Sequence, residues 1–281
     1  RLRRQPDRLG AVPHRPGHGD PAGPGQPAPP GRRAAGASPP PISRPGAAAP
    51  CAGGHVLGIG LRSKRHPVDR LFGGGPGGGV FASNNLTLAG VSLRNNSASG
   101  GSGEGGGIYA LGVLSVSNST FALNSSDARG GAIRAIGDAQ ISDSQILSNT
   151  AGGHGGGIAA NAQLILYGGL FQNNVGYSSG GGVMIYNTGS LSITNTQFIN
   201  NTAGPVYAGG GVYQQGDNPV LINGAWFERN HAIDGSAVGG AGAAIESANN
   251  TILNTSWISN SVNNGAGGGL FLYGGGTVTN N

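Results

Sequence analysis

The chain has 281 residues, of which 58 are glycine, 17 are proline and one is cysteine, and charged residues make up 10%. So much glycine excludes a helical bundle, because each interior glycine costs a helix about 1 kcal/mol relative to alanine. One cysteine excludes a disulfide scaffold within the chain. No apolar run approaches the roughly 18 residues of a transmembrane helix.

The net charge of +5 is the sum of two unlike segments. Residues 1–70 carry 12 of the 16 Lys and Arg and 3 of the 11 Asp and Glu, a balance of +9; residues 71–281 carry 4 and 8, a balance of −4. Because the second segment is acidic, we expect no nucleic-acid partner for it.

Residues 1–71 are rich in Arg, Pro, Gly and Ala and almost free of aromatic and β-branched side chains. Such a segment buries too little apolar surface to offset its chain entropy, so we expect it to be disordered. Three interpretations stay open: translation of a GC-rich gene out of frame, a spacer, or a polybasic arm. No secretory signal is visible, because the longest apolar run, 56–61, is shorter than the 7–15 residues that an h-region needs.

Residues 72–281 contain eight repeats, each marked by small residues and an aliphatic anchor. The anchors follow one another at intervals of 28, 25, 25, 25, 29, 33 and 25 residues; they are Val80, Ile108, Ile133, Ile158, Val183, Val212, Ile245 and Leu270. A second block, such as "LSITNTQFINN" (191–201), alternates apolar with small polar residues, which is the pattern of a strand with one buried face.

Each repeat therefore predicts strand, turn, strand, turn, with too few inward side chains to form a core alone. Stacking the repeats at the strand spacing of about 4.8 Å buries the apolar residues as continuous columns. The predicted fold class is all-β, a right-handed parallel β-helix of about 7–8 rungs over residues 72–281. The last repeat is unfinished, so we expect the chain to be a fragment.

An asparagine follows the bulky apolar column in every repeat. We expect these residues to form a hydrogen-bonded ladder at the bends of the coils, where asparagine tolerates the left-handed backbone of sharp turns. They are Asn96, Asn124, Asn149, Asn174, Asn201, Asn230 and Asn260.

The repeats resemble those of chlamydial-type polymorphic outer membrane proteins, which carry tandem FxxN and GGA[ILV] motifs. The motifs that carry the resemblance are "FALN" (121–124) with "GGAI" (130–133), "FQNN" (171–174) with "GGGV" (180–183), and "FINN" (198–201) with "GGGV" (209–212). The resemblance implies a right-handed β-helix of the pectin-lyase-like class, in a secreted or surface-displayed passenger at the bacterial outer membrane.

Chemistry on a β-helix needs clustered carboxylates, either around Ca²⁺ or as an acid–base pair. The nearest approach to such a set is Asp127, Arg129, Arg134, Asp138 and Asp143. The set is interpreted as a surface ion cluster, and a calcium or catalytic cluster is the alternative. No catalytic residue or metal ligand is assigned. His154 and His231 are placed in turns, three rungs apart, as surface histidines.

Two features suggest a binding edge. The position after each anchor is expected to face outward and includes several aromatics; it reads Phe81, Tyr109, Arg134, Ala159, Met184, Tyr213, Glu246 and Phe271. The longest turns carry polar side chains, and loops carry function on a repetitive scaffold. The candidate binding residues are Tyr207, Tyr213, Gln215, Asp217, His231 and Asp234.

The functional prediction is a non-enzymatic extracellular or cell-surface β-helix, a stalk or adhesin-like passenger that contacts glycan or a host or neighbour-cell protein. The alternative is a polysaccharide lyase or hydrolase that acts on extracellular carbohydrate. No cofactor is required by the first interpretation.

Overall fold

The computed structural model describes residues 68–69, 72–73, 75–186, 188–206, 209–233, 239–263 and 265–279. The chain divides into two compact units, Arg1–Gly46 and Ala47–Asn281, and every described residue belongs to the second. The predicted disorder of residues 1–71 therefore concerns residues that, apart from 68 and 69, lie outside the described residues. The described part is a parallel β-solenoid, as the repeats predict.

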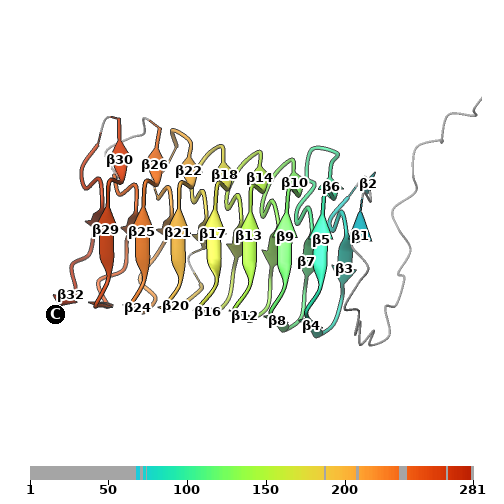
Figure 1. Cartoon of the computed structure of the whole chain (residues 1–281), viewed down its shortest axis with the longest axis horizontal. Helices are drawn as coiled ribbons and strands as arrows, with labels where there is room; N and C mark the ends of the chain where they lie inside the picture. The colour runs from blue at the N-terminus through green and yellow to red at the C-terminus, as the bar shows by residue number, and fades with distance from the viewer. Residues whose placement is uncertain are drawn as a thin grey trace, which may run out of the picture. The chain divides into compact units, whose positions relative to one another are not determined.

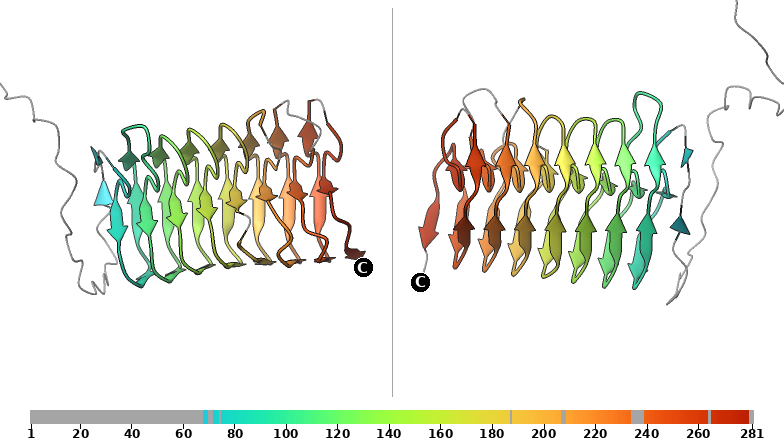
Figure 2. Two further views of the ribbon diagram at one scale, coloured as in Figure 1. Left: turned by 180° about the vertical axis from the view of Figure 1, so that it is seen from behind. Right: turned by 45° about the horizontal axis from the view of Figure 1, so that its top comes forward.

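The solenoid consists of short strands that repeat in the order sheet C, sheet D, sheet A, sheet B around each coil (Figure 1). In the described residues there are four sheets of eight strands. Seven coils are complete, from β3–β6 to β27–β30, and two strands precede and follow them. All strand pairs between coils are parallel. Figure 2 shows the same stacking from two other sides.

The strands of sheet C carry the anchors, and those of sheet D follow them. Sheet C contains β3 (Val80–Ala82), β7 (Ile108–Ala110), β11 (Ile133–Ala135), β15 (Ile158–Ala160), β19 (Val183–Ile185), β23 (Val212–Gln214), β27 (Ala243–Ile245) and β31 (Leu270–Leu272). Sheet D contains β4 (Leu86–Ala89), β8 (Leu114–Ser117), β12 (Ala139–Ser142), β16 (Leu164–Tyr167), β20 (Leu191–Thr194), β24 (Val220–Asn223), β28 (Asn250–Leu253) and β32 (Thr277–Thr279).

The strands of sheet A carry the bulky apolar column, and the two-residue strands of sheet B follow the asparagines. Sheet A contains β1 (Val68–Asp69), β5 (Ser92–Arg94), β9 (Thr120–Ala122), β13 (Gln145–Leu147), β17 (Leu170–Gln172), β21 (Gln197–Ile199), β25 (Trp226–Glu228) and β29 (Ser256–Ile258). Sheet B contains β2 (Phe72–Gly73), β6 (Ser97–Ala98), β10 (Ser125–Ser126), β14 (Thr150–Ala151), β18 (Val175–Gly176), β22 (Thr202–Ala203), β26 (His231–Ala232) and β30 (Ser261–Val262).

Each coil has four strands, whereas the sequence pattern predicts two. The second block bends after sheet D, where Asn195 adopts a φ of 52°, and again after sheet A, where Asn200 adopts a φ of 54°. A bend that occupies one or two residues leaves the apolar–polar alternation nearly intact. The alternation alone therefore cannot distinguish one long strand from two short ones.

Sheet A begins earlier than the predicted domain boundary at residue 72. β1 pairs with β5 so that Val68 lies beside Leu93. Parallel pairing therefore starts inside the segment predicted to be disordered.

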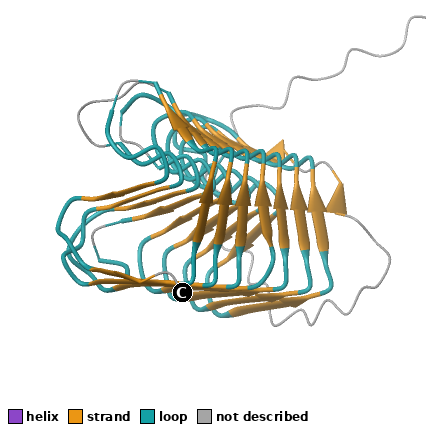
Figure 3. Cartoon of the chain, turned by 60° about the vertical axis from the view of Figure 1, so that its left-hand side comes forward, coloured by secondary structure: helices purple, strands orange, loops and turns teal. Residues whose placement is uncertain are grey.

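The core is made of inward side chains from sheets C, D and A, stacked in register from coil to coil. Figure 3 shows the strands of successive coils side by side around this interior. Phenylalanines of the bulky column stack face to face: the ring centroids of Phe198 and Phe227 are 4.8 Å apart, and those of Phe227 and Trp257 are 4.4 Å apart. The columns predicted from the sequence are thus real columns of contacting side chains.

One predicted anchor is wrong. Val212 pairs with Ala243, not with Ile245, which lies beside Gln214. Residues two apart in a strand share a face, so an offset of two keeps an apolar residue inward and hides the error.

The asparagine ladder is present and is buried along most of its length. In a middle rung, the backbone N–H and Nδ2 of Asn149 both donate to Oδ1 of Asn174, each at 3.0 Å, and Nδ2 also donates to the carbonyl of Phe121 at 3.0 Å. The same donor–acceptor pattern runs from Asn124 to Asn230.

The ladder asparagines do not themselves adopt the left-handed backbone that asparagine tolerates. Positive φ falls on the residue before each of them, which is Asn95, Leu123, Ser148, Asn173, Asn200, Arg229 or Ser259. The preceding residue makes the bend, which leaves the ladder asparagine inside the coil with both its amide and its backbone N–H directed at the next rung.

Candidate functional site

Of the six residues predicted to bind, Tyr207 and Asp234 lie outside the described residues. Tyr213 lies in β23, Gln215 and Asp217 lie in the turn that follows β23, and His231 lies in β26 rather than in a turn.

Tyr213 is buried, so the predicted outward aromatic strip is wrong at this position. It packs with Met184, Ala232 and Ala244 in a second apolar cluster, which joins the outer face of sheet C to sheet B. Its hydroxyl donates to the Glu246 carboxylate. Sheet B therefore covers part of the face that the period-2 pattern assigns to solvent.

The remaining predicted residues are separate from one another. Asp217 is exposed, and the backbone N–H of Gln215 donates to the carbonyl of Ile185 at 3.0 Å. Nδ1 of His231 lies 2.9 Å from Oγ of Ser261 on sheet B. No hydrogen bond or ion pair between described residues joins His231 to the turn after β23.

Two carboxylates of the predicted ion cluster bind the scaffold rather than one another. Oδ2 of Asp127 accepts the N–H of Gly100 at 2.8 Å, and Oδ1 of Asp138 accepts the N–H of Gln163 at 3.2 Å. Asp143 lies in the turn after β12 with a φ of 45°, not in a strand. In the described part of the chain, no group of three or more His, Cys, Asp or Glu residues is placed to hold a metal ion.

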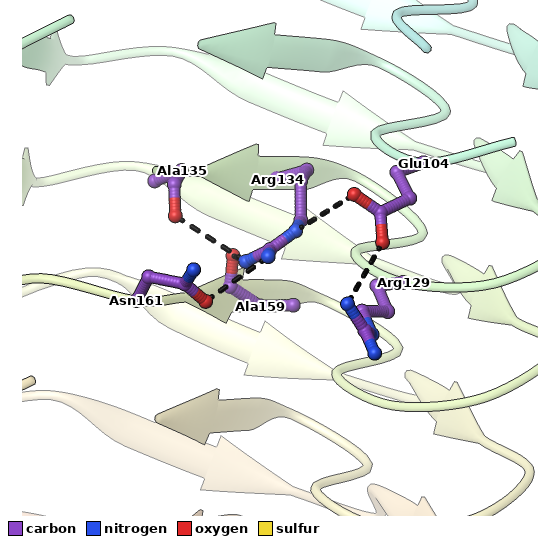
Figure 4. Close-up of polar contacts among 6 residues, drawn as sticks. All are labelled: Glu104, Arg129, Arg134, Ala135, Ala159 and Asn161. Atoms are coloured by element: carbon purple, nitrogen blue, oxygen red, sulfur yellow. Dashed lines mark hydrogen bonds and ion pairs between the residues drawn. The ribbon is translucent and has the colours of Figure 1, made fainter. Parts of the chain in front are cut away.

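The two arginines of that predicted cluster do come together, with a partner that lies one coil earlier. Glu104 accepts from Nε of Arg134 at 3.1 Å through one oxygen and pairs with Arg129 at 3.3 Å through the other (Figure 4). We call the group formed by Glu104, Arg129, Arg134, His154, Asn161, Ser179 and Tyr186 the arginine cluster.

Arg134 is the buried member of the arginine cluster, with 2% of its surface exposed. Its Nη1 donates to the carbonyls of Ala135 and Ala159 at 3.4 and 3.3 Å, and its Nη2 donates to Oδ1 of Asn161 at 3.0 Å (Figure 4). Alanine at position 159 leaves the room into which the guanidinium extends along the outer face of sheet C. A buried guanidinium that is bonded through all three nitrogens holds its position firmly.

Tyr186 closes the arginine cluster from two coils further along. The guanidinium carbons of Arg129 and Arg134 lie 5.2 and 5.3 Å from its ring centroid, which is cation–π distance. The His154 ring meets it edge-on at 6.1 Å. The Tyr186 hydroxyl is buried and forms no hydrogen bond with the described residues.

Burial and positive charge set the protonation of this group. Burial, and then the Arg129 charge, lower the pKa of His154 below 6.5, so the imidazole is neutral at pH 7. Its Nδ1 lies 2.5 Å from Oγ of the buried Ser179. Burial raises the pKa of Tyr186 above 10, against the opposing effect of the two arginines, so the phenol stays protonated.

The arginine cluster thus offers one half-exposed cation, because 44% of the Arg129 side chain is exposed. A neutral imidazole and a protonated phenol lie beside it. Such a group can attract an anion. Its described members include one carboxylate, that of Glu104, whereas most glycoside hydrolases use a pair of carboxylates.

Sequence reasoning found the two arginines and missed their partners. The position just before the glycine triplet reads Glu104, Arg129, His154 and Ser179 in four successive repeats, and the parallel bridges between 129, 154 and 179 place three of these side by side. Reading this turn column across the repeats would have found the group. Tyr186 had no such signal, because its ring leans across two coils.

In the described residues, no helix is long and apolar enough to cross a lipid bilayer. Comparison of the chain with protein families, with characterised proteins and with solved structures finds no match.

Proposed function

We propose that this protein is a non-enzymatic β-solenoid, secreted or displayed at a bacterial cell surface, that acts as a stalk or adhesin-like passenger and contacts a glycan or a protein. The observation that carries the proposal is that carboxylates of the described coils are engaged in holding the scaffold together. In the described coils, Asp127, Asp138, Glu104 and Glu246 accept hydrogen bonds from backbone N–H groups or pair with fixed side chains.

A stalk needs rigidity along its axis, and two features supply it. Four sheets join each coil to the next, and the buried asparagine ladder adds amide-to-amide bonds between successive coils. Because each coil pairs its strands only with those of the adjacent coils, the length of such a rod scales with the number of repeats. The exposed outer faces are then available for contact.

The location rests on the repeats. Their FxxN and GGA[ILV]-like motifs resemble those of chlamydial-type polymorphic outer membrane proteins, and the resemblance supports both the surface location and the pectin-lyase-like class of β-helix. The low content of cysteine and charge is compatible with passage through a bacterial envelope.

A second candidate function is polysaccharide cleavage, favoured by one observation. The arginine cluster places a half-exposed Arg129 beside a neutral His154 and a protonated Tyr186. An arginine can neutralise a uronate carboxylate while a second group moves a proton.

Digestion of polysaccharides separates the two functions. The full chain is incubated with neutral and acidic polysaccharides, and the release of reducing or unsaturated ends is measured, while retention of intact polymer on the immobilised protein is measured in parallel. Arg129→Ala tests the arginine cluster, and Arg94→Ala, an exposed arginine on β5, is the matched control.

Retention without new chain ends is the expected result. New ends that disappear in Arg129→Ala but persist in Arg94→Ala would replace the non-enzymatic proposal by the enzymatic one. If Asp143→Ala abolishes the release of new chain ends instead, the cleavage site lies at the turn between sheet D and sheet A that contains Asp143.

A further inference from the structure

The outer face of sheet A presents a column of aligned, uncharged side chains. They occupy the first position of each sheet A strand from β5 to β29, and each lies beside its counterpart in the next coil. The column, which we call the sheet A column, is Ser92, Thr120, Gln145, Leu170, Gln197, Trp226 and Ser256. The strands of sheet A lie at the front of Figure 1, with no other described element before them.

Trp226 is the largest side chain of the sheet A column, and 39% of it is exposed. It is also fixed in place. Its indole N–H donates to Oε2 of Glu228 at 3.0 Å, and Oε1 of Glu228 pairs with Arg229 at 3.0 Å. A planar side chain that is held before the ligand arrives loses little entropy on binding.

Polar groups flank the indole at one-strand intervals. Gln197 precedes Trp226 and Ser256 follows it in the register of sheet A, and Gln145 lies two strands before Gln197. Strands in a sheet lie about 4.8 Å apart, so from Gln145 to Ser256 the column spans about 19 Å. Side chains of successive coils point the same way and can reach successive units of one extended polymer.

The chemistry of the column selects the kind of ligand. Amides and hydroxyls donate and accept hydrogen bonds with sugar hydroxyls, and an indole stacks on the apolar face of a pyranose ring. No member of the sheet A column is charged. Beside Trp226, Glu228 and Arg229 pair with each other, and the exposed Arg94 lies on β5, two strands before Gln145. Along β13 to β29, an acidic polymer would find only Arg229, which is already paired with Glu228, and a protein interface would have a more apolar centre.

We propose that the sheet A column binds a neutral, extended polysaccharide that lies parallel to the stack of coils, with one sugar ring on Trp226. The proposal rests on the function proposed above and names the ligand class and the face. It places recognition on sheet A rather than on the long turns after β22, β23 and β26.

The test measures binding of cellohexaose, a neutral β-linked glucan, to the full chain by calorimetry and by tryptophan fluorescence. Trp226→Ala removes the stacking surface, and Gln197→Ala removes one flanking amide. Leu221→Ala is the matched control, because Leu221 is also 39% exposed and lies in the same coil, on sheet D. Far-UV circular dichroism verifies that each variant is folded.

We expect binding to weaken at least tenfold in Trp226→Ala, about threefold in Gln197→Ala and not at all in Leu221→Ala. Equal affinity of Trp226→Ala and the unaltered chain overturns the sheet A site and leaves the stalk function intact. The same holds if the unaltered chain binds an acidic polysaccharide or a protein but not cellohexaose. Cleavage of polysaccharide that Trp226→Ala does not affect defeats the non-enzymatic function separately.

Discussion

Asn174 lies in the middle of the asparagine ladder, where the contribution of one rung can be measured. Its Nδ2 donates to Oδ1 of Asn201 at 2.9 Å and to the carbonyl of Ile146 at 2.8 Å, and its Oδ1 accepts from the backbone N–H and Nδ2 of Asn149, both at 3.0 Å. Asn174→Ala removes these four bonds and leaves the buried N–H of Asn149 without its acceptor.

The size of the loss follows from those bonds. A net intramolecular hydrogen bond contributes about 1 kcal/mol, and a buried donor left unsatisfied costs about 1–3 kcal/mol. We therefore expect Asn174→Ala to lower the free energy of unfolding by about 5–7 kcal/mol, a large part of the roughly 5–15 kcal/mol typical of a domain.

Two asparagines of the same chain act as controls. Asn260 makes three such bonds and is partly exposed, so Asn260→Ala should cost about half as much. Asn173 has a φ of 57°, which glycine also adopts, and its Oδ1 accepts one exposed bond from Nδ2 of Asn200, so Asn173→Gly should lower the free energy of unfolding by less than about 1 kcal/mol.

Urea unfolding followed by circular dichroism measures the free energy of unfolding, and hydrogen exchange at the Asn149 amide measures local opening. The second measurement stays informative where a repeat array does not unfold in one step. A loss below about 1 kcal/mol in Asn174→Ala, or equal losses in all three variants, would refute the view that the ladder bonds stabilise the stack.

Three further outcomes are expected, each measurable by the same unfolding experiment. Gly156→Ala should prevent folding or lower the free energy of unfolding by more than about 3 kcal/mol, because the added methyl group would overlap the backbone of the next coil. Gly90 has a φ of 65° and open space around it, so Gly90→Ala should cost about 1–2 kcal/mol. Equal effects of the two substitutions would contradict the close approach of the coils. Arg134→Ala should lower the free energy of unfolding by about 3–5 kcal/mol, because it removes a buried partner of Glu104. The Arg129 side chain is 44% exposed, so Arg129→Ala should cost under about 1 kcal/mol. A larger loss in Arg129→Ala than in Arg134→Ala would be evidence against a buried pair. The pKa of His154 is lowered in the folded protein, so below about pH 6.5 the unfolded chain binds more protons than the folded chain. The free energy of unfolding should therefore fall as the pH falls. If His154→Asn leaves this pH dependence unchanged, the histidine is not its cause.

The columns were predictable from the sequence because a solenoid turns periodicity into contact. A residue at one template position lies about 4.8 Å from its counterparts in the neighbouring coils, so alignment of the repeats is already a contact map. The pairings of Phe121 with Ile146 and of Phe171 with Phe198 are examples. The prediction failed by two residues at Ile245, where the preceding turn is longest and the period-2 pattern permits two registers.

The arginine cluster was only half predictable. Arg129 and Arg134 were found together because they are close in sequence, and Asp138 and Asp143 were grouped with them for the same reason. In a coil, however, residues five to ten apart lie on different sheets, whereas Glu104, about 25 to 30 residues earlier, lies beside both arginines. Contacts in this solenoid are therefore predicted by equivalent positions in adjacent coils, and not by short separation in the sequence.

The repeats were enough to predict the solenoid, the buried columns and the asparagine ladder, because each depends on a pattern that recurs from repeat to repeat. Which outward positions are exposed could be seen only in the folded chain. Tyr213 and Arg134 alternate outward as Trp226 does, yet sheet B or a side chain from another coil covers the first two, and Trp226 remains accessible on sheet A. The alternation of apolar and polar residues predicts which face of the sheet a side chain occupies. Whether water or a ligand can reach that side chain depends on which other parts of the chain pack against that face.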